Sequence, residues 1–377
     1  MKKKIAHIAG GLTTGGVEAV LLNYFSHMDT TEYELHYISY GTPDPLMQKK
    51  FEALGFVVHE VPKKKEHFLK STVAVYRILK ENQINIVHSH MTLMSFMTSF
   101  LGLLCGVKVR IAHSHLAQYP TGIKKGIYGF FKVLTKITSN VYFACGEQAA
   151  VYLYGKKNLQ KGNVHIMHNA IDLEKYQPDE GVRKKLRSQL GIENCFCIGN
   201  VGRFTEQKNQ SYLINAFSLF LKQNPSAKLL LVGEGALLEP AKELAEALQI
   251  TDSVLFLGAR DDVASFYQAM DLFVLPSLYE GLAVVLVETE CAGLPILASD
   301  TVTREIDLLK TIQYLPLEES MEQWVVKMKE YSGRYETLFE TRKEQSRQTA
   351  EVLKNAGYSI WQEAKKLDGF YTKALER

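Results

Sequence analysis

The sequence has no apolar stretch long enough to cross a membrane. The longest one, residues 91–107, is interrupted by four hydroxyl side chains, Thr92, Ser95, Thr98 and Ser99. It is shorter than the about 20 residues that a membrane-spanning helix needs. At the amino terminus, the lysines are followed only by Ile5 to Ile8 before a glycine turn, which is too short for the apolar region of a signal peptide. We therefore expect a soluble, cytoplasmic protein.

Cysteine is scarce, and its pattern argues against a disulfide framework. The five cysteines include no C-x-x-C pair, and their number is odd, which indicates reduced thiols in a cytosolic protein. No nucleic-acid-binding motif is evident, and the basic residues are not interleaved with an aromatic stacking platform. Nucleic acid is therefore not expected as a partner.

Net charge is small, at +3, but it is distributed unevenly along the chain. Residues 1–170 contain 20 Lys+Arg and 10 Asp+Glu, a net charge of +10, whereas the remainder contains 24 and 31, a net charge of −7. All eleven histidines also lie before residue 170. This asymmetry predicts two domains with different partners, of which the basic one suits an anionic surface.

A chain of 377 residues can bury a large core and is expected to form two domains. Short apolar runs alternate with helical patterns, which is typical of parallel sheets built from βαβ units. We predict strands at Ile5–Ala9, Leu35–Ser39, Val57–Val61, Ile84–His88, Val107–Ala112, Val141–Ala144 and Val164–Met167 in the first half, and at Phe196–Val201, Lys228–Val232, Val254–Leu257, Leu272–Leu275, Ile296–Ala298 and Ile312–Tyr314 in the second.

The polar stretch that begins at Asn169 is the best linker candidate, so that the first domain covers residues 1–170 and the second covers residues 171–355. After about residue 320, helical patterns replace strands. The spacing of apolar residues predicts a final amphipathic helix within residues 356–377. Those apolar residues are Tyr358, Trp361, Ala364, Leu367, Phe370, Tyr371 and Leu375.

Residues 276–298 form the most informative stretch of the chain. A buried apolar run stops at Pro276, a loop with Glu280 and Gly281 follows, and a helical pattern then opens near Ala283 and closes at a Gly-Leu-Pro stop. In an open α/β sheet, ligands bind outside the carboxyl ends of the strands. The stretch therefore predicts a ligand site where the strand, the loop and the helix start meet.

The helix start and two carboxylates specify what this site would bind. The amides near Leu282, Ala283 and Val284 favour an anion, most naturally a phosphate. Glu280 lies on the loop and Glu288 lies eight residues later on the helix. Taken alone, either glutamate could equally be an ordinary surface residue, because most charged residues are exposed.

The whole string resembles the E-x7-E signature of the retaining glycosyltransferases of family 4, including the surrounding P-S-x-x-E-G and G-L-P. It departs from the family at Ala283, where Pro or Gly is frequent, and at Cys291-Ala292, where the order is often Ala-Cys. The resemblance implies an α/β protein of the GT-B fold, with two Rossmann-like parallel-sheet domains facing a cleft and a carboxyl-terminal helix that crosses back to the first domain. It also implies that Glu280 contacts the transferred sugar and that Glu288 contacts the ribose.

A glycine-rich turn follows the first predicted strand and opens a helix at Gly15, Gly16 and Glu18. Glycines allow backbone amides to approach a phosphate closely, although tight turns need glycines in any case. The G-x-G-x-x-G spacing of a dinucleotide-binding dehydrogenase is absent. The turn resembles the Gly-Gly-x-Glu loop of family 4, which implies that Gly15 and Gly16 face the donor and that Glu18 lies on the acceptor side.

Two predicted strands end in the string His-Ser-His, at His88 and His90 and again at His113 and His115. A zinc site is one interpretation, because imidazole is the commonest metal ligand. Against it, alternate residues at a strand end need not converge, and no cysteine or carboxylate is near in sequence. The family resemblance implies instead that His113 or His115, with His115 preferred, approaches the transferred sugar, and that His90 lies on the acceptor side.

The second domain opens with Gly202 and Arg203 after a strand, followed by Lys208 at the next helix. As surface charges they would be unremarkable, but beside a phosphate site they could neutralise a diphosphate leaving group in place of a Mg²⁺ ion. They match the paired Arg and Lys of family 4. Glu234 and Arg260, in the loops after the next two strands, match further donor-binding loops of the family.

Residues 122–138 interleave lysines with apolar residues. The preferred interpretation is a crossover helix packed on the sheet, and the alternative is a basic amphipathic helix on an anionic membrane leaflet. The lysines are Lys124, Lys125, Lys132 and Lys136, and the apolar residues are Ile123, Ile127, Phe130, Phe131, Leu134 and Ile137.

Together these features predict a retaining glycosyltransferase that moves a hexose from a nucleotide-sugar, namely a UDP-sugar, to a lipid-linked saccharide or polysaccharide acceptor in cell-surface polysaccharide synthesis. No cofactor and no metal are expected. The enzyme is expected in the cytoplasm, with the inner face of the cell membrane as a peripheral location. Two alternatives remain, a nucleotide-sugar 2-epimerase of the GT-B fold and a non-catalytic subunit that binds a sugar nucleotide.

Overall fold

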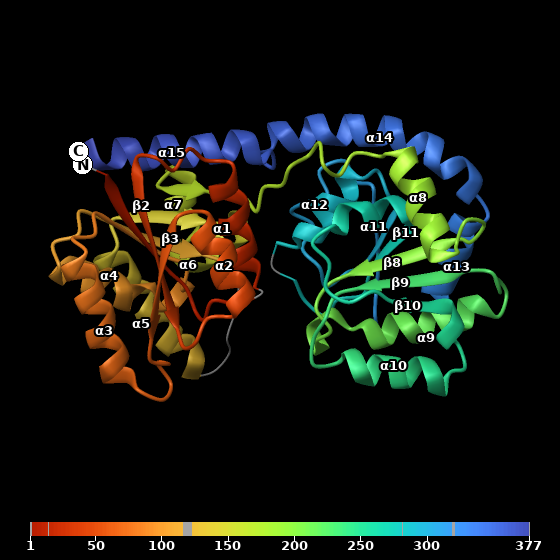
Figure 1. The fold of residues 1–377 in the computed structure, drawn as a ribbon, viewed down its shortest axis with the longest axis horizontal. Helices are drawn as coiled ribbons and strands as arrows, with labels where there is room; N and C mark the ends of the chain where they lie inside the picture. Colours follow the sequence, from red (N-terminus) through yellow and green to blue (C-terminus); the bar gives the residue numbers. More distant parts are fainter. Residues whose placement is uncertain (1, 14, 116–122, 281, 319–320, 377) are drawn as a thin grey trace. The chain divides into compact units, whose positions relative to one another are not determined.

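The computed structural model describes residues 2–13, 15–115, 123–280, 282–318 and 321–376; the side chains at 123, 124, 335–338 and 340 are also outside the description. The chain divides into two compact units, one made of residues 1–170 and 359–377 and the other of residues 171–358. Each unit is a parallel sheet covered by helices (Figure 1). In the described part of the chain, no helix is both long and apolar enough to span a bilayer.

The first unit contains a seven-stranded parallel sheet with the strand order β3-β2-β1-β4-β5-β6-β7. The order reverses between β1 and β4, and such a switch point is where doubly wound sheets bind ligands. The strands are β1 (Lys3–Ile8), β2 (Tyr33–Tyr40), β3 (Phe56–Val61), β4 (Ile86–Ser89), β5 (Val109–Ser114), β6 (Val141–Ala144) and β7 (Val164–Ile166).

Helices connect these strands, as parallel pairing requires. They are α1 (Gly16–Ser26), α2 (Pro45–Ala53), α3 (Phe68–Glu81), the 3₁₀ turn η1 (Thr92–Met94), α4 (Ser95–Leu104), α5 (Ile123–Thr138), α6 (Glu147–Tyr154) and α7 (Lys156–Gln160).

The last helix, α15 (Ile360–Glu376), packs on the first unit. Its buried residues Ala364, Leu367 and Tyr371 join the core formed by the β1–β5 region. The prediction that Trp361 belongs to the buried face is wrong, because its side chain is 60% exposed. Its indole lies nearly perpendicular to the His27 ring, with 4.6 Å between ring centroids.

The predicted start of the final helix is also wrong by a few residues. Gly357 has φ +90°, which stops the preceding helix, and the amide of Tyr358 then bonds the carbonyl of Leu353. This closure keeps Tyr358 in the core of the second unit. The chain therefore passes from one unit to the other at residues 358 and 359.

The second unit contains a six-stranded parallel sheet with the order β10-β9-β8-β11-β12-β13. Its strands are β8 (Cys197–Val201), β9 (Lys228–Val232), β10 (Val254–Phe256), β11 (Leu272–Leu275), β12 (Ile296–Ser299) and β13 (Ile312–Leu315). Its helices are α8 (Glu180–Leu190), η2 (Glu206–Lys208), α9 (Gln210–Leu221), α10 (Leu238–Ala247), η3 (Thr251–Ser253), α11 (Val263–Ala269), α12 (Val284–Cys291), α13 (Met321–Ser332) and α14 (Tyr335–Asn355).

All thirteen predicted strands are confirmed, with ends displaced by at most two residues. The two-residue displacements at the starts of β4 and β5 have a common cause. The amides of Ile84 and Val107 bond the carbonyls of Leu79 and Gly102, so these two apolar residues close the preceding helices instead of starting strands. At its other end, β5 extends to Ser114, so His113 lies inside the strand.

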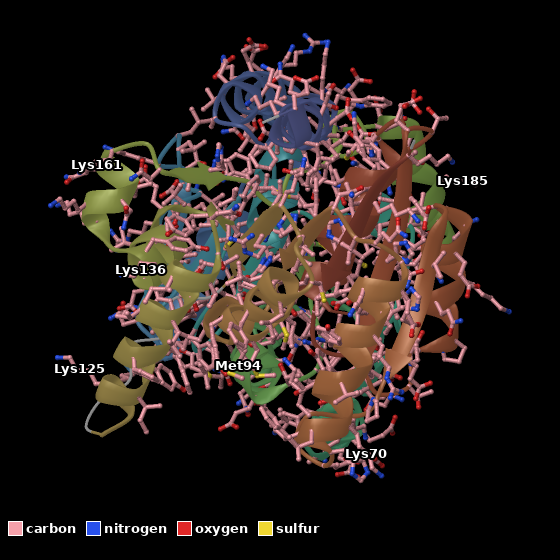
Figure 2. All side chains as sticks on the ribbon, turned by 90° about the vertical axis from the view of Figure 1, so that its left-hand side faces the viewer. Lys70, Met94, Lys125, Lys136, Lys161 and Lys185 are labelled. Atoms are coloured by element: carbon pink, nitrogen blue, oxygen red, sulfur yellow. The ribbon has the colours of Figure 1, made fainter. Side chains whose placement is uncertain are left out.

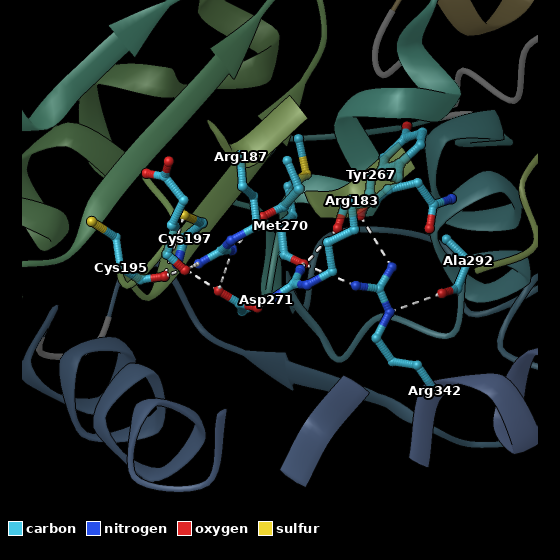
Figure 3. Close-up of polar contacts among 12 residues, drawn as sticks. Arg183, Arg187, Cys195, Cys197, Tyr267, Met270, Asp271, Ala292 and Arg342 are labelled. Atoms are coloured by element: carbon cyan, nitrogen blue, oxygen red, sulfur yellow. Dashed lines mark hydrogen bonds and ion pairs between the residues drawn. The ribbon is translucent and has the colours of Figure 1, made fainter. Parts of the chain in front are cut away.

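A buried ionic network fixes the start of β11 in the second unit (Figure 3). The carboxylate of Asp271, which is 3% exposed, pairs with Arg183 and Arg187 and accepts the amide of Cys197 at 2.8 Å. Arg342 of α14 donates to the carbonyls of Ala292, Met270 and Tyr267 at 2.9–3.1 Å. The network thus joins α8, β8, β11 and α14.

We expect Asp271→Asn to lower the free energy of unfolding of the second unit by about 3 kcal/mol or more, because breaking a buried ion pair leaves uncompensated charge. Asp262→Asn is the matched control, since Asp262 pairs with Arg260 at the surface, where such pairs contribute about 0–1 kcal/mol. Urea denaturation followed by tryptophan fluorescence measures both variants. Equal small losses for the two substitutions would contradict the proposed importance of the network.

Candidate functional site

Two loops at the carboxyl ends of neighbouring strands carry the candidate site of the second unit. Strand β8 pairs with β11, so the loop after Val201 lies beside the loop after Leu275. Backbone and side-chain bonds cross-link the loops, since the Leu278 amide bonds the Gln207 carbonyl at 2.8 Å and the Asn209 side chain bonds the Pro276 carbonyl at 3.2 Å. The two predicted motifs are therefore parts of one surface.

An ion pair between Lys208 and Glu280 lies at the centre of these loops. The Lys208 Nζ atom is 2.6 Å from Glu280 Oε1, and the two side chains are 17% and 7% exposed. The Ser277 hydroxyl donates to the same Glu280 oxygen at 2.6 Å, and the Gln207 amide donates to the other oxygen at 3.2 Å. A cation and a carboxylate, both predicted from sequence, are thus held side by side in fixed orientations.

Close approach between backbones shapes the floor of this site. Gly233 and Gly235 have φ values of +142° and +153°, and a Cβ atom at either position would lie 2.1 Å and 2.4 Å, respectively, from the carbonyl oxygens of Gly202 and Phe204. The amide of Gly202 bonds the Val232 carbonyl at 2.9 Å. The glycines after β9 are therefore needed to seat the 202–204 loop.

Arg203 is exposed on this loop, and within the described part of the chain its guanidinium has no hydrogen bond or ion pair. Its backbone is fixed, because its carbonyl accepts the Gln210 side chain at 3.1 Å. A positioned backbone with a free cationic side chain can reach an anion from solution.

Glu288 lies on α12 between two tyrosine hydroxyls. Tyr176 and Tyr267 donate to its two carboxylate oxygens at 2.8 Å and 2.7 Å. Burial raises the pKa of Glu288, and the two tyrosine hydrogen bonds oppose that shift. The carboxylate keeps acceptor capacity for a ligand hydroxyl, since each oxygen can accept a second bond.

The two tyrosines were not predicted from sequence. Tyr176 follows the linker and Tyr267 lies on α11, so neither is near Glu288 along the chain. For Tyr267, its place on the apolar face of a predicted helix was a usable signal that the side chain points into the unit.

The start of α12 is open to a ligand. Ala283 is the cap residue and is 3% exposed, and in the described part of the chain this cap position makes no side-chain hydrogen bond to the helix that begins at Val284. The first amides of a helix lack internal acceptors, which is the physical basis of the predicted anion site; that site stays a prediction. Leu282 is half-buried beside it, whereas Gly281 lies outside the described residues.

Two further predicted residues are not part of the Lys208–Glu280 cluster. Glu234 is exposed on the loop after β9. Arg260 is exposed after β10 and pairs with Asp262, with Nε 2.9 Å from Oδ1. Within the described part of the chain, neither side chain bonds Lys208 or Glu280. Glu234 lies on the loop after β9, and Arg260 lies on the loop after the edge strand β10.

In the first unit, the glycine turn is closed over its own glutamate. A Cβ atom at Gly15 would lie 2.2 Å from the Glu18 carboxylate, and α1 begins at Gly16 as predicted. Glu18 is 5% exposed and accepts the Tyr37 hydroxyl at 2.8 Å. The carboxylate is therefore buried at the turn, and a side chain at position 15 would displace it.

Five histidines meet at the carboxyl ends of β1, β4 and β5. His7 is paired in register with His88 on the neighbouring strand. Ring nitrogens of His90 lie 3.0 Å from His7 and 2.9 Å from His115, and those of His88 and His113 lie 3.0 Å apart. The sequence argument that the His-Ser-His residues need not converge is wrong, because parallel pairing of adjacent strands aligns their ends.

Burial controls the charge of this histidine cluster (His7, His88, His90, His113 and His115). Desolvation lowers the pKa of His7 to about 3 and that of His115 to about 4, and it also holds the pKa of the other three well below the ordinary value. All five imidazoles are therefore neutral at physiological pH. His7 was missed from sequence, although a histidine inside a buried strand next to His88 was a usable signal.

Comparison with known families matches both units. Residues 14–175 match the model described as Glycosyltransferase Family 4, and residues 182–313 match the model described as Glycosyl transferases group 1. The putative glycosyltransferase EpsF of Bacillus subtilis is 31% identical over 333 residues, which is 86% of each chain. A UDP-Gal:alpha-D-GlcNAc-diphosphoundecaprenol alpha-1,3-galactosyltransferase of Escherichia coli is 26% identical over 310 residues, covering 79% of this chain and 80% of the relative.

Solved structures agree with these matches at the level of the fold. HepE of Anabaena in complex with UDP-glucose superimposes with a TM-score of 0.76 at 18% identity, over 98% of this chain and 99% of HepE. WaaG, a glycosyltransferase of lipopolysaccharide biosynthesis, gives a TM-score of 0.72 at 18% identity, over 96% and 99% of the two chains. The chain therefore belongs to the glycosyltransferases of the GT-B fold, with a family 4 amino-terminal domain and a group 1 carboxyl-terminal domain.

Proposed function

We propose that this glycosyltransferase is a retaining enzyme that moves a hexose from a UDP-sugar to a lipid-linked saccharide or polysaccharide acceptor in exopolysaccharide synthesis. The observation that carries the proposal is the contact between Lys208 and Glu280 at 2.6 Å. A nucleotide-sugar presents its diphosphate and its sugar hydroxyls on either side of one anomeric bond. A cation beside a carboxylate complements this arrangement, because the cation can bind the diphosphate while the carboxylate accepts hydrogen bonds from the sugar hydroxyls.

The second unit would hold the donor. Lys208 and Arg203 would neutralise the diphosphate, together with the amides at the start of α12 (Leu282, Ala283 and Val284), because a helix start favours anions. Positive charge from side chains can replace the metal ion that other transferases use on the leaving group. Donor chemistry is therefore proposed to need no divalent metal.

Glu288 would bind the ribose, and Glu280 would bind the sugar. The tyrosines on Glu288 hold its carboxylate in one orientation, as a hydroxyl-binding group requires. Glu280 is oriented by Ser277 and Lys208, and it would hold the hexose as positive charge develops at the anomeric carbon. Glu234 and Arg260 are proposed for the outer part of the nucleotide.

The first unit would bind the acceptor. It carries the excess positive charge of the chain, which suits a phosphate-linked lipid carrier. His115, at the accessible end of the histidine cluster, and His113 are proposed to approach the sugar, with Gly15 and Gly16 near the phosphates and Glu18 and His90 on the acceptor side. The name of the Escherichia coli relative, which specifies UDP-Gal and a diphosphoundecaprenol acceptor, supports both substrate classes.

An apolar surface of the first unit supports a peripheral position on the membrane. Helix α4 contacts both α3 and α5, and several apolar side chains of α4 and α5 are about half exposed or more. Helix α5 connects β5 to β6, in line with the preferred prediction of a crossover helix, and its exposed apolar side chains support the alternative that it also lies on a membrane leaflet. Lys125 and Lys136 extend from the same helix (Figure 2), whereas the Lys124 side chain is outside the described residues. The exposed apolar side chains are Phe100, Leu103, Leu104, Ile127, Phe130, Val133 and Ile137.

Transfer is expected to need both a UDP-sugar and a lipid-linked saccharide, and to continue in excess EDTA. Arg203→Ala should slow it at least tenfold, since a charge-assisted hydrogen bond contributes about 1.5–3 kcal/mol. Arg347→Ala, at an exposed position on α14, is the matched control and should leave the rate of transfer unchanged. Radiolabelled transfer with a panel of UDP-sugars measures the rates, and NMR of the product gives the anomeric configuration.

Three results would contradict this proposal. Inversion at the anomeric carbon would reject the retaining mechanism. Activity lost in EDTA and restored by Mg²⁺ or Mn²⁺ would reject the charge role of Arg203 and Lys208. Turnover of donor to an epimer without acceptor would reject transfer itself.

The two glutamates are expected to behave differently in steady-state kinetics. Glu288→Gln should raise KM for the donor and leave kcat near wild type, because ribose contacts change little between ground and transition states. Glu280→Gln should lower kcat by about 10²-fold or more, the scale of a lost electrostatic stabiliser. The measurement varies the donor at saturating acceptor.

Tyr267→Phe and Glu206→Gln provide the controls for these substitutions. Tyr267→Phe removes only the hydroxyl that orients Glu288, so it should raise KM less than Glu288→Gln does. Glu206→Gln changes an exposed carboxylate of the same region and should have no effect. If both Glu280→Gln and Glu288→Gln left kcat and KM unchanged, the site assignment would fail.

The exposed apolar surface should bind anionic vesicles. Replacing Ile127, Phe130 and Ile137 together by Ser should weaken co-sedimentation with anionic liposomes at least tenfold, because each fully buried apolar side chain of this size contributes about 1.5–3 kcal/mol. Raising the salt concentration should weaken binding as well, since the Debye length is only about 10 Å at 0.1 M.

The matched control replaces Leu219, Leu309 and Val326 by Ser, which are exposed apolar residues of the second unit. This variant should sediment like wild type. Equal sedimentation of the wild-type chain with neutral and anionic vesicles would contradict the membrane proposal without touching the transferase activity.

A further inference from the structure

We propose that His90, His113 and His115 form a binding site for a divalent transition-metal ion such as Zn²⁺, separate from the diphosphate site of the second unit. The three histidines lie at the carboxyl ends of β4 and β5.

The spacing of the ring nitrogens suits a small ion. One nitrogen from each of the three residues lies within 4.8 Å of the other two, and His90 Nδ1 is 2.9 Å from His115 Nε2. Zinc binds imidazole nitrogen at about 2.0–2.1 Å, which places neighbouring nitrogens of a tetrahedral site roughly 3.3 Å apart. Small side-chain rotations would therefore bring the three nitrogens onto one ion.

His113 has a nitrogen available for this purpose. Its Nε2 atom is buried and has no hydrogen-bond partner in the described part of the chain. Its other nitrogen, Nδ1, lies 3.0 Å from His88 Nε2, and His88 Nδ1 lies 2.7 Å from the Tyr371 hydroxyl. A ligating His113 would donate its Nδ1–H to His88, and His88 would donate to Tyr371, so the supporting bonds remain satisfied.

The second ring nitrogen of His90 also has a hydrogen-bond partner. Its Nε2 atom lies 3.0 Å from His7 Nδ1, so a His90 that binds the ion through Nδ1 can donate its remaining proton to His7. Metal-binding histidines nearly always donate their second ring nitrogen in this way, which fixes the tautomer and the ring orientation. Both supporting acceptors are present before any ion binds.

The three imidazole ligands determine which class of ion the site prefers. Imidazole nitrogens suit Zn²⁺, Cu²⁺ and Ni²⁺, whereas Mg²⁺ and Ca²⁺ prefer oxygen ligands, and none is present in this triad. His115 follows the end of β5 and is only partly buried, so it is the most accessible of the three ligands. The other possible triad, His7, His88 and His90, is 0–6% exposed and is therefore less accessible.

Occupation of this site should affect transfer, and this consequence rests on the proposed function. An ion held by His113 and His115 would withdraw these side chains from the sugar. Micromolar Zn²⁺ is therefore expected to inhibit, and EDTA to restore activity, which is the reverse of a metal requirement. If the ion binds and transfer continues at the same rate, the sugar-binding role of the histidines fails and the metal site stands.

The test uses the full chain without donor or acceptor. After treatment with EDTA and dialysis, the chain is titrated with Co²⁺. We expect one Co²⁺ per chain with the intense visible bands of a four-coordinate ion, and displacement by Zn²⁺. His115→Asn should weaken binding about 100-fold or more, since even the loss of a supporting residue commonly costs 10–100-fold.

His59→Asn is the matched control, because His36 and His59 form another histidine pair at 2.9 Å that belongs to no triad among the described residues. It should bind Co²⁺ like wild type. X-ray absorption of the Zn²⁺-loaded wild-type chain requires no variant to fold, and it should show three imidazole nitrogens at about 2.0–2.1 Å. Absence of stoichiometric binding, or loss in His59→Asn but not in His115→Asn, would overturn the proposal.

Discussion

Parallel pairing of neighbouring strands is the constraint on which both candidate sites depend. It places the carboxyl ends of paired strands at one edge of a sheet, so residues far apart in sequence meet there. In the second unit, the pairing of β8 with β11 brings Lys208 to Glu280. In the first unit, the pairing of β1, β4 and β5 gathers the five histidines.

The two sites solve the problem of buried polar groups in different ways. Lys208 and Glu280 are partly desolvated, and their opposite charges and the Ser277 hydroxyl compensate one another. Within the described residues, no ion pair joins the histidine cluster to a carboxylate, so burial favours the neutral rings and each ring bonds a neighbouring ring. Asp271, at the start of β11, ties the strand that leads to Glu280 to α8, which links the stability of the second unit to the geometry of its site.

Local patterns predicted much of the fold and the separate parts of the site. The strands, the start of α1 and the loops with Lys208 and Glu280 were all evident from apolar runs, glycines and charges. The contact between Lys208 and Glu280, the tyrosines on Glu288, and the inclusion of His7 could not be predicted, because strand order and side-chain direction are not local properties. The starts of β4 and β5 were predicted two residues too early for a local reason. An apolar residue such as Ile84 or Val107 can either close a helix or begin a strand, and the neighbouring sequence is the same in both cases.

A crystal structure of this chain with UDP bound is the most direct test of whether the second unit binds the donor. We expect the diphosphate to contact Arg203, Lys208 and the amides at the start of α12, and the ribose hydroxyls to contact Glu288. Glu280 should lie next to the terminal phosphate, where the sugar would be attached. A diphosphate bound elsewhere, with Arg203 in solvent and no nucleotide contact at Glu288, would contradict the proposed donor site.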